Sequence, residues 1–251
     1  MKIGILGVGT IATCVVTGFC GLDDRHDFFL SPRNVVKSAA LAEKYGNCRV
    51  CLSNQEVLDN SDVIIISMNA ASVAIALPTL TFRDDHVIIN LVASIPPEDI
   101  LTAVGAVKGF YHVVPLPFVE KRIGPIAAYP ECGWLHNLLT PLGNIVFAKN
   151  MDEIRTMQAI TALMSTFYET LNGLTLFAEA HGMDGKKAKD FAAAFFGALC
   201  VRAEEANSFR DLALDMTPGG LNEFCVRILE ERGVTQAWAA ILPEVLEKIK
   251  P

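Results

Sequence analysis

The sequence lacks an excess of positive charge. Its 251 residues include 21 lysines and arginines against 28 aspartates and glutamates, which gives a formal net charge of −7. Proteins that bind nucleic acids or anionic lipid surfaces neutralise phosphates with clustered basic side chains. The composition therefore argues against a nucleic-acid partner, and we expect a small-molecule ligand.

The sequence also lacks a hydrophobic run of the roughly 20 charge-free residues that a membrane-spanning helix needs. Glycines interrupt the apolar opening, and Phe19 before Cys20 does not fit a lipoprotein cleavage site. The seven cysteines are odd in number, scattered and mostly set in apolar surroundings, which is typical of buried free thiols. We therefore expect a cytoplasmic protein that has no membrane partner.

Two halves of different character make up the chain. In the first half, short β-rich runs alternate with amphipathic stretches, which predicts parallel βαβ units. The expected strands are Lys2–Leu6, Asp27–Leu30, Arg49–Leu52, Val63–Ser67 and Val87–Leu91, with further strands at Gly109–Val114, Pro125–Tyr129 and Asn144–Ala148. We expect an α/β fold, in which a Rossmann dinucleotide-binding domain over residues 1–149 precedes an all-helical domain over residues 150–251.

The second half is rich in alanine, leucine, methionine, glutamate and lysine at helical spacing. Met151–His181 predicts one long helix or two helices broken at Asn172–Gly173. Asp184 is expected to cap the next helix, which continues through Arg202. After a Thr217-Pro218-Gly219-Gly220 turn, the pattern predicts helices over Asn222–Arg232 and Thr235–Ile249.

A glycine-rich turn directly follows the first expected strand. Gly7-Val8-Gly9-Thr10-Ile11-Ala12 has the GxGxxA spacing of a dinucleotide site. Gly7 permits the tight turn, Gly9 lets a pyrophosphate approach the backbone, and Ala12 lets the helix pack closely on the strand. The N–H groups at the helix start would bind the anion. An ordinary strand-to-helix turn is the alternative, but the place within a βαβ pattern favours nucleotide binding.

The end of the second strand indicates which dinucleotide is bound. Domains specific for NAD carry an acidic residue there, which binds both ribose hydroxyls. This strand instead continues into Ser31-Pro32-Arg33-Asn34, without a carboxylate. Ser31, Arg33 and Asn34 can hold a 2′-phosphate, Arg33 by a charge-assisted fork. We therefore expect NADP(H), while a simple helix-capping turn with a solvated arginine remains open.

The chain resembles pyrroline-5-carboxylate reductases over nearly its whole length. The features that carry the resemblance are, in order, the GxGxxA turn, the Ser31–Asn34 turn, Pro115-Leu116-Pro117, the helical second half and the Thr217–Gly220 turn. The resemblance implies reduction of a C=N bond by hydride from NADPH, as in proline formation from 1-pyrroline-5-carboxylate, a cyclic imino acid. It also implies a homodimer through the C-terminal helices, or a larger homo-oligomer.

The resemblance further assigns residues to two sites. Met68, Asn69 and Ala93, which follow the fourth and fifth strands, are expected at the cofactor. Thr217, Gly219, Gly220 and Asn222 are expected to hold the substrate carboxylate, although a plain helix–helix connection fits the same Pro-Gly-Gly sequence. His112, at a strand end near the expected cleft, is a further candidate for contact with the substrate or nicotinamide, although a histidine in this position more often has a structural role.

Several family motifs are altered, so other functions stay open. Ser67-Met68-Asn69-Ala70 replaces the Ala-Val-Lys-Pro of the family. The alternatives are an NADP-dependent dehydrogenase acting on a different imine, keto acid or hydroxy acid, and a non-catalytic NADP-binding regulatory protein. No lysine lies between Met151 and Gly185, where β-hydroxyacid dehydrogenases carry their catalytic lysine. Cys48 and Cys51 have CxxC spacing, but residues three apart on a strand face opposite ways, so we expect no metal site.

Overall fold

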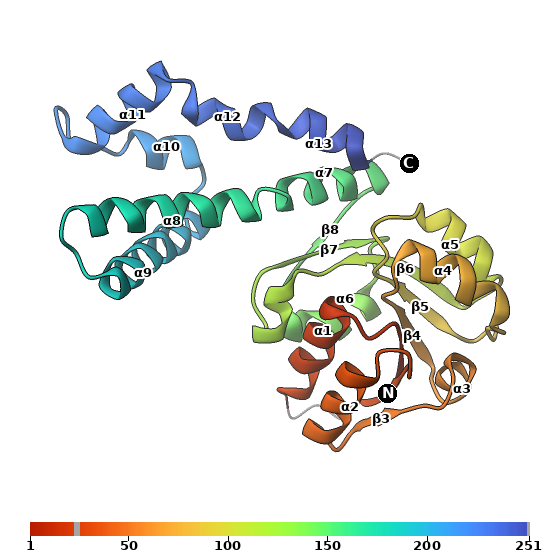
Figure 1. The fold of residues 1–251 in the computed structure, drawn as a ribbon. Coiled ribbons are helices and arrows are strands. Elements are labelled where there is room, and N and C mark those ends of the chain that lie inside the picture. The colour runs from red at the N-terminus through yellow and green to blue at the C-terminus, as the bar shows by residue number, and fades with distance from the viewer. Residues whose placement is uncertain (23–25, 250–251) are drawn as a thin grey trace. The chain divides into compact units, whose positions relative to one another are not determined.

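The computed structural model describes residues 1–22 and 26–249 (Figure 1). Within these residues, eight strands form one sheet in the order β3-β2-β1-β4-β5-β6-β7-β8. The strands are β1 (Lys2–Leu6), β2 (Asp27–Leu30), β3 (Cys48–Val50), β4 (Val63–Ile66), β5 (Val87–Asn90), β6 (Gly109–Val114), β7 (Pro125–Tyr129) and β8 (Asn144–Phe147). All neighbours are parallel except β6 and β7, which are antiparallel. The predicted α/β fold is confirmed.

Helices cover both faces of this sheet. They are α1 (Thr10–Cys20), α2 (Val35–Lys44), α3 (Asn54–Asp59), α4 (Ala70–Ala76), α5 (Pro97–Val104) and α6 (Gly133–Leu139), with the short 3-10 helices η1 (Leu77–Thr79), η2 (Pro117–Lys121) and η3 (Thr140–Leu142). Ile65 packs in the cluster that includes α1, α2 and α6, whereas Ile64 and Ile66 pack in the cluster with α3, α4 and α5. This two-sided burial explains why the strands read as continuous apolar runs.

Strand β3 is shorter than predicted. It begins at Cys48 and ends at Val50, whereas the sequence suggested Arg49–Leu52. Cys51 is still buried and its N–H donates to the Leu30 carbonyl at 2.9 Å, but Leu52 is 91% exposed. Because β3 is at the edge of the sheet, no further layer covers Leu52, and an apolar side chain alone did not extend the strand.

The strand order creates a crevice beside β1. The chain passes from β1 to β2 and β3 on one side, and then crosses to β4 and β5 on the other side. In doubly wound sheets, ligands bind outside the carboxyl ends of the strands where the order reverses in this way. The segments that follow β1, β2, β4 and β5 are therefore the place to look for a site.

The second half of the chain is helical, as predicted. Its helices are α7 (Met151–Thr161), α8 (Met164–Ala180), α9 (Gly185–Glu204), α10 (Phe209–Leu214), α11 (Leu221–Glu231), α12 (Val234–Ala240) and α13 (Leu242–Ile249). Asp184 caps α9 and accepts from the Lys187 N–H, at 3.0 Å, as expected.

Two helix boundaries and one additional helix in this half differ from the prediction. The break lies at Ala162–Leu163, between α7 and α8, and α8 continues through Asn172 and Gly173. A mid-helix glycine costs only about 1 kcal/mol, which a long helix tolerates. Helix α10 was not predicted. The last expected helix is divided at Ile241, because Pro243 in the first turn of α13 cannot continue the ladder of α12.

The chain divides into two compact units, one over Met1–Met157 and one from Gln158 onward. The predicted domain boundary, after Lys149, directly precedes α7. Ile154 of α7 is fully buried and clusters with Ala127 and Ala148 of the first unit. The first turns of α7 therefore belong to the packing of the sheet.

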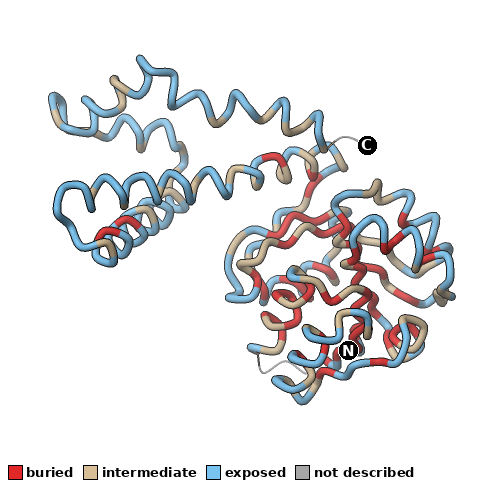
Figure 2. The backbone as a smooth tube through the Cα atoms, viewed as in Figure 1, coloured by how far each residue is buried: buried red, intermediate tan, exposed pale blue. Residues whose placement is uncertain are grey.

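Burial differs sharply between the units. Figure 2 shows the buried residues concentrated on the sheet of the first unit, and mostly exposed residues on the helices from α8 onward. Helix α8 has no buried residue, and α9 has only Ala188 and Ala192. No helix in the described part of the chain is long and apolar enough to cross a membrane.

Candidate functional site

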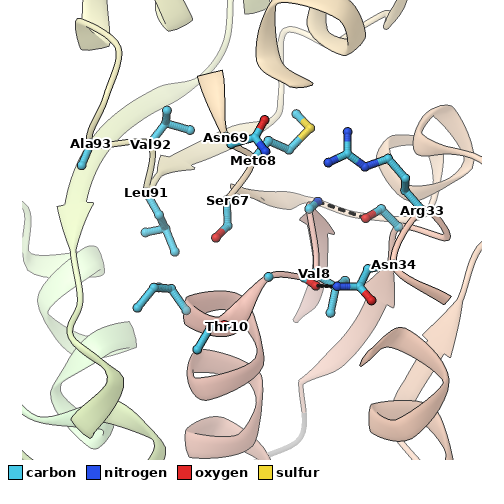
Figure 3. Close-up of a pocket in the computed structure, with 14 residues that line it drawn as sticks. Val8, Thr10, Arg33, Asn34, Ser67, Met68, Asn69, Leu91, Val92 and Ala93 are labelled. Carbon is cyan, nitrogen blue, oxygen red and sulfur yellow. Dashed lines mark hydrogen bonds between the residues drawn. The ribbon is translucent and has the colours of Figure 1, made fainter. Parts of the chain in front are cut away.

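A cavity of about 400 Å3 lies at the carboxyl ends of β1, β2, β4 and β5 (Figure 3). Its volume is typical of small-molecule sites. Its lining consists of residues from the turns after these four strands, namely Gly7, Val8, Gly9, Thr10, Ile11, Ser31, Arg33, Asn34, Ser67, Met68, Asn69, Leu91, Val92 and Ala93. None of these lining residues is acidic. The cavity occupies the crevice that the strand order predicts.

The glycine-rich turn forms the floor of this cavity. Gly7 has φ +93°, and a Cβ there would lie 2.7 Å from the Ser67 carbonyl oxygen, so the turn requires glycine. Helix α1 begins at Thr10, and the first N–H groups of a helix have no partner within it. These groups carry the positive end of the helix dipole and can bind an anion. Ala12 does not line the cavity, since it is fully buried between α1 and the sheet.

Hydrogen bonds join the glycine-rich turn to the turn after β2, and both are dashed in Figure 3. The Gly7 N–H donates to Ser31 Oγ at 3.0 Å, and Asn34 Nδ2 donates to the Val8 carbonyl at 2.9 Å. Asn34 also caps α2, accepting from the Lys37 N–H at 3.3 Å. Ser31 and Asn34 thus shape the cavity wall, and the capping role that the sequence left open for this turn is present.

Arg33 is exposed at one side of the cavity, opposite Leu91 and Ala93 in Figure 3. Its Nη1 donates to Ser72 Oγ at 2.5 Å, and Ser72 Oγ donates to Asn69 Oδ1 at 2.7 Å. Asn69 is the N-cap of α4, so this chain of bonds ties the guanidinium to the start of a helix. One edge of the guanidinium is held, and its remaining N–H groups can bind an anionic group.

Several residues of this cavity were not predicted from the sequence, and two of them form side-chain hydrogen bonds at its edge. Lys37 Nζ donates to Thr10 Oγ1 at 2.9 Å, which brings a second cation to the cavity edge. Ser72, which holds Arg33, was also overlooked. Both occupy the first turn of a helix that follows a strand of the sheet, and this position was the available signal. Ser67, Leu91 and Val92 also line the cavity and directly follow strands.

The structure brings the cofactor candidates together. Apart from Ala12, every residue predicted for the nucleotide lines this one cavity. The substrate candidates are divided between the two units. His112 is in β6, and the Thr217–Gly220 turn is in the other unit.

His112 lies outside the cavity lining and is 3% exposed. Asn90 Oδ1 accepts from the Val92 N–H at 3.0 Å, so its Nδ2 faces His112 Nδ1, also at 3.0 Å. Nδ1 must then accept, and the proton of the neutral ring is on Nε2. Burial lowers the pKa of His112 to about 4. The histidine supports Val92 of the cavity wall through Asn90, which favours the structural role over a substrate contact.

Protonation of His112 is expected to destabilise the fold. The pKa is about 4 in the folded chain and about 6.5 in the unfolded chain, so the unfolded chain binds more protons between these values. The free energy of unfolding should fall by up to about 3 kcal/mol from this group as the pH drops from 6.5 to 4. Urea unfolding at pH 7 and pH 4.5 measures this free energy in the wild type and in the His112→Gln variant. The glutamine amide oxygen can still accept a hydrogen bond from Asn90. If the difference in the free energy of unfolding between the wild type and the variant were the same at both pH values, the lowered pKa of His112 would be contradicted.

A second cavity, of about 460 Å3, lies at the start of α11 in the helical unit. Gly219 and Gly220 line it, but Thr217 and Asn222 do not. Both glycine N–H groups are already engaged, Gly219 with Glu223 Oε2 and Gly220 with the Thr217 carbonyl at 2.9 Å. A substrate carboxylate at this turn would therefore have to displace Glu223, which supplies a carboxylate of its own.

No group of three histidine, cysteine, aspartate or glutamate side chains suited to a metal ion is found in residues 1–22 and 26–249. Cys48 and Cys51 of the CxxC spacing pack into different clusters, on opposite faces of the sheet. This is the geometry that strand periodicity predicts.

The first part of the chain is similar to one known protein family. Residues 2–94 match the model described as NADP oxidoreductase coenzyme F420-dependent. This segment contains β1 to β5 and all of the first cavity. No curated protein sequence is similar to the chain at a significant level.

Solved structures resemble the chain over its full length. A 1-pyrroline-5-carboxylate reductase from Streptococcus pyogenes superposes with a TM-score of 0.86 at 20% identity, covering 100% of this chain and 98% of that one. The pyrroline carboxylate reductase of Plasmodium falciparum, with NADP bound, gives 0.84 at 14% identity, covering 100% and 97%. A reductive aminase from Aspergillus terreus in complex with NADPH gives 0.52 at 18% identity, covering 98% and 92%. Over its whole length the chain therefore has the fold of pyrroline-5-carboxylate reductases.

Proposed function

We propose that this chain is an NADPH-dependent imine reductase of the pyrroline-5-carboxylate reductase family, and that it reduces 1-pyrroline-5-carboxylate to L-proline. The observation that carries the proposal is the charge at the first cavity. Arg33 and Lys37 are at its edge, and no acidic residue lines it. The family model for residues 2–94 and the whole-chain fold support the same conclusion.

The cavity offers three kinds of contact to a dinucleotide. The N–H groups at the start of α1 suit the pyrophosphate, since they are unpaired within the helix and lie at its positive end. Arg33 and Lys37 suit the 2′-phosphate of NADP. NAD-specific sites instead use a carboxylate that binds the ribose hydroxyls, and such a carboxylate would repel the 2′-phosphate. Met68, Asn69 and Ala93 also line the cavity. NADPH supplies the hydride when it is bound.

No acid–base dyad is needed for this chemistry. A protonated imine is already a strong electrophile, so the protein has to align the two reacting carbons and exclude water. Consistent with this, His112, which supports the cavity wall through Asn90, is buried and its pKa is lowered to about 4. We assign His112 to positioning Val92.

We further propose a homodimer formed through the C-terminal helices. Phe177 of α8 is 64% exposed, and Phe191 and Phe195 of α9 are 68% and 49% exposed. Phe191 and Phe195 stack with their ring centroids 6.5 Å apart, and exposed apolar side chains that lie together are typical of a protein interface. Sedimentation velocity should give twice the 27.2 kDa chain mass, and a monomer at micromolar concentration would contradict the dimer.

A second candidate function is reduction of an imine without a carboxylate. It rests on Glu223, whose carboxylate accepts a hydrogen bond from the Gly219 N–H. The family resemblance assigns this turn to the substrate. A fixed carboxylate there repels an anionic substrate and accepts a neutral or cationic one. The turn itself otherwise suits a small ligand, because α11 begins directly after it.

One assay tests both candidates. Oxidation of NADPH and of NADH is followed with 1-pyrroline-5-carboxylate and, in parallel, with 1-pyrroline, which has the same ring without the carboxylate. Turnover of the carboxylate with NADPH preferred supports the proposed function, and turnover of 1-pyrroline alone supports the second candidate. Tight NADPH binding without turnover of either imine would overturn both and favour a non-catalytic NADP-binding protein.

The Glu223→Gln variant sharpens this test. It removes the negative charge and keeps a side chain that reaches the turn. We expect kcat/KM for the anionic imine to rise by about tenfold, with 1-pyrroline changed by less than about twofold. Equal changes in kcat/KM for both imines would contradict the assignment of Glu223 to the substrate site.

A further inference from the structure

A pair of thiols lies at the end of the first unit that is remote from the cavity. Cys20 is the last residue of α1, and Cys48 is the first residue of β3. Their Sγ atoms are 3.9 Å apart. The cavity lies at the carboxyl ends of the strands, whereas Cys48 begins its strand and pairs with Phe28 near the start of β2.

The backbone around Cys48 is held by several hydrogen bonds. The Cys48 N–H donates to the Tyr45 carbonyl at 3.0 Å, and the Phe28 N–H donates to the Asn47 carbonyl at 2.8 Å. Asn47 Nδ2 donates to the His26 carbonyl at 2.8 Å, which turns Asn47 Oδ1 toward the thiol of Cys20, 3.6 Å away. These hydrogen bonds therefore hold the two thiols next to each other in the folded chain.

The two thiols differ in access and acidity. Cys20 is half-buried, whereas Cys48 is 5% exposed. The hydrogen bond from Cys48 lowers the pKa of Cys20 against the opposing effect of burial, and the ammonium of Lys44 also lowers it. The same pairing, together with burial, raises the pKa of Cys48. A reagent from solution therefore meets Cys20 first, because Cys20 is the more exposed thiol and its pKa is the one that is lowered.

We propose that Cys20 and Cys48 form a thiol-oxidation site that small-molecule disulfides, such as oxidised glutathione, convert into an intramolecular disulfide. The Cys20 thiolate attacks one sulfur of the oxidant, forms a mixed disulfide and releases one thiolate. Cys48 then loses its proton to solvent and attacks Cys20 Sγ, which releases the second thiolate. The two protein thiols lose two electrons, and the oxidant is reduced to two thiols.

The bond would link the end of α1 to the edge strand of the sheet. An S–S bond of about 2.05 Å requires the sulfurs to approach by roughly 2 Å, which rotation of the half-buried Cys20 side chain provides in large part. The link closes a long loop of chain and so stabilises the folded state. Because the cavity is at the opposite end of the strands, we expect the disulfide to leave nucleotide binding unchanged.

Incubation of the native protein with oxidised glutathione tests the proposal. After free thiols are alkylated, peptide mapping should recover the Cys20 and Cys48 peptides joined, with the loss of two hydrogens, and the melting temperature should rise by about 5 °C. Cys48→Ser should stop the reaction at a glutathione adduct on Cys20. Cys51→Ser, which changes a buried cysteine on the other face of the sheet, is the matched control and should still form the link.

Three results would overturn it. They are a glutathione adduct on Cys20 that persists in the wild type, a link between other cysteines, and a Cys20–Cys48 link that forms only in denaturant. Melting of each reduced variant establishes that it is folded. Cys20→Ser serves as a second variant, because a half-buried serine is tolerated more easily than one at Cys48.

Discussion

Arg33→Ala is expected to weaken NADPH binding by about 10- to 100-fold and to change NADH binding by less than about threefold. A hydrogen-bonded guanidinium–phosphate pair contributes about 1.5–3 kcal/mol, and only NADPH carries the 2′-phosphate. The bond from Arg33 to Ser72 Oγ, at 2.5 Å, holds the side chain in place before the ligand arrives. Fluorescence titration of each reduced nucleotide measures the two dissociation constants.

Two further variants serve as controls for Arg33. Arg33→Lys keeps the charge and loses the planar fork, so NADPH affinity should fall between those of the wild type and Arg33→Ala. Lys37→Ala should weaken NADPH binding by a smaller factor, since Lys37 bonds Thr10 from an exposed position. Equal losses of NADPH and NADH affinity in Arg33→Ala would remove the residue from the 2′-phosphate site.

Gly18→Ala is expected to lower the free energy of unfolding by about 2–3 kcal/mol. Alanine within a helix is normally favoured over glycine by about 1 kcal/mol, so the expected sign is the reverse of the usual one. The reason is the close approach of α1 to η2, where a Cβ on Gly18 would lie 2.3 Å from the Val119 carbonyl oxygen and 2.9 Å from Leu142 Cδ2. A backbone atom cannot rotate away, so the helix has to shift. Urea unfolding of the wild type and the variant measures the difference.

Gly173→Ala is the matched control for Gly18→Ala. Gly173 is also inside a helix, α8, but a Cβ there would meet nothing within 4 Å. The free energy of unfolding should rise by up to about 1 kcal/mol. If Gly18→Ala stabilised the protein as Gly173→Ala does, the packing of α1 against η2 would be looser than the structure indicates.

Much of the sheet could be predicted because its strands are covered on both sides. Val63–Ile66 is entirely buried, and Lys2–Leu6 nearly so, and such runs stand out in a sequence. Local signals also placed the cap at Asp184. The break at Ala162–Leu163 had no such signal, since neither residue interrupts a helix by its own chemistry.

The site was predictable only in part, for a physical reason. The glycine-rich turn and the turn after β2 are local patterns, and both line the cavity. The bond from Lys37 to Thr10, and that from Arg33 to Ser72, join residues 27 and 39 positions apart, so they exist only once the strands have paired. The engagement of the Gly219 N–H by Glu223 depends on a rotamer choice within one turn of α11, which composition does not reveal.

The burial of Ile154 in α7 bears on how the nucleotide-binding unit could be isolated or exchanged with that of a relative. Ile154 is fully buried against Ala127 and Ala148, five residues after the apparent end of the α/β pattern at Lys149. A fragment that stops at Lys149 would leave this apolar surface bare and prone to aggregate. A junction placed after Thr161, where α7 ends, keeps Ile154 in the same fragment as the sheet residues that it packs against. Chimeras joined there should remain stable and well expressed.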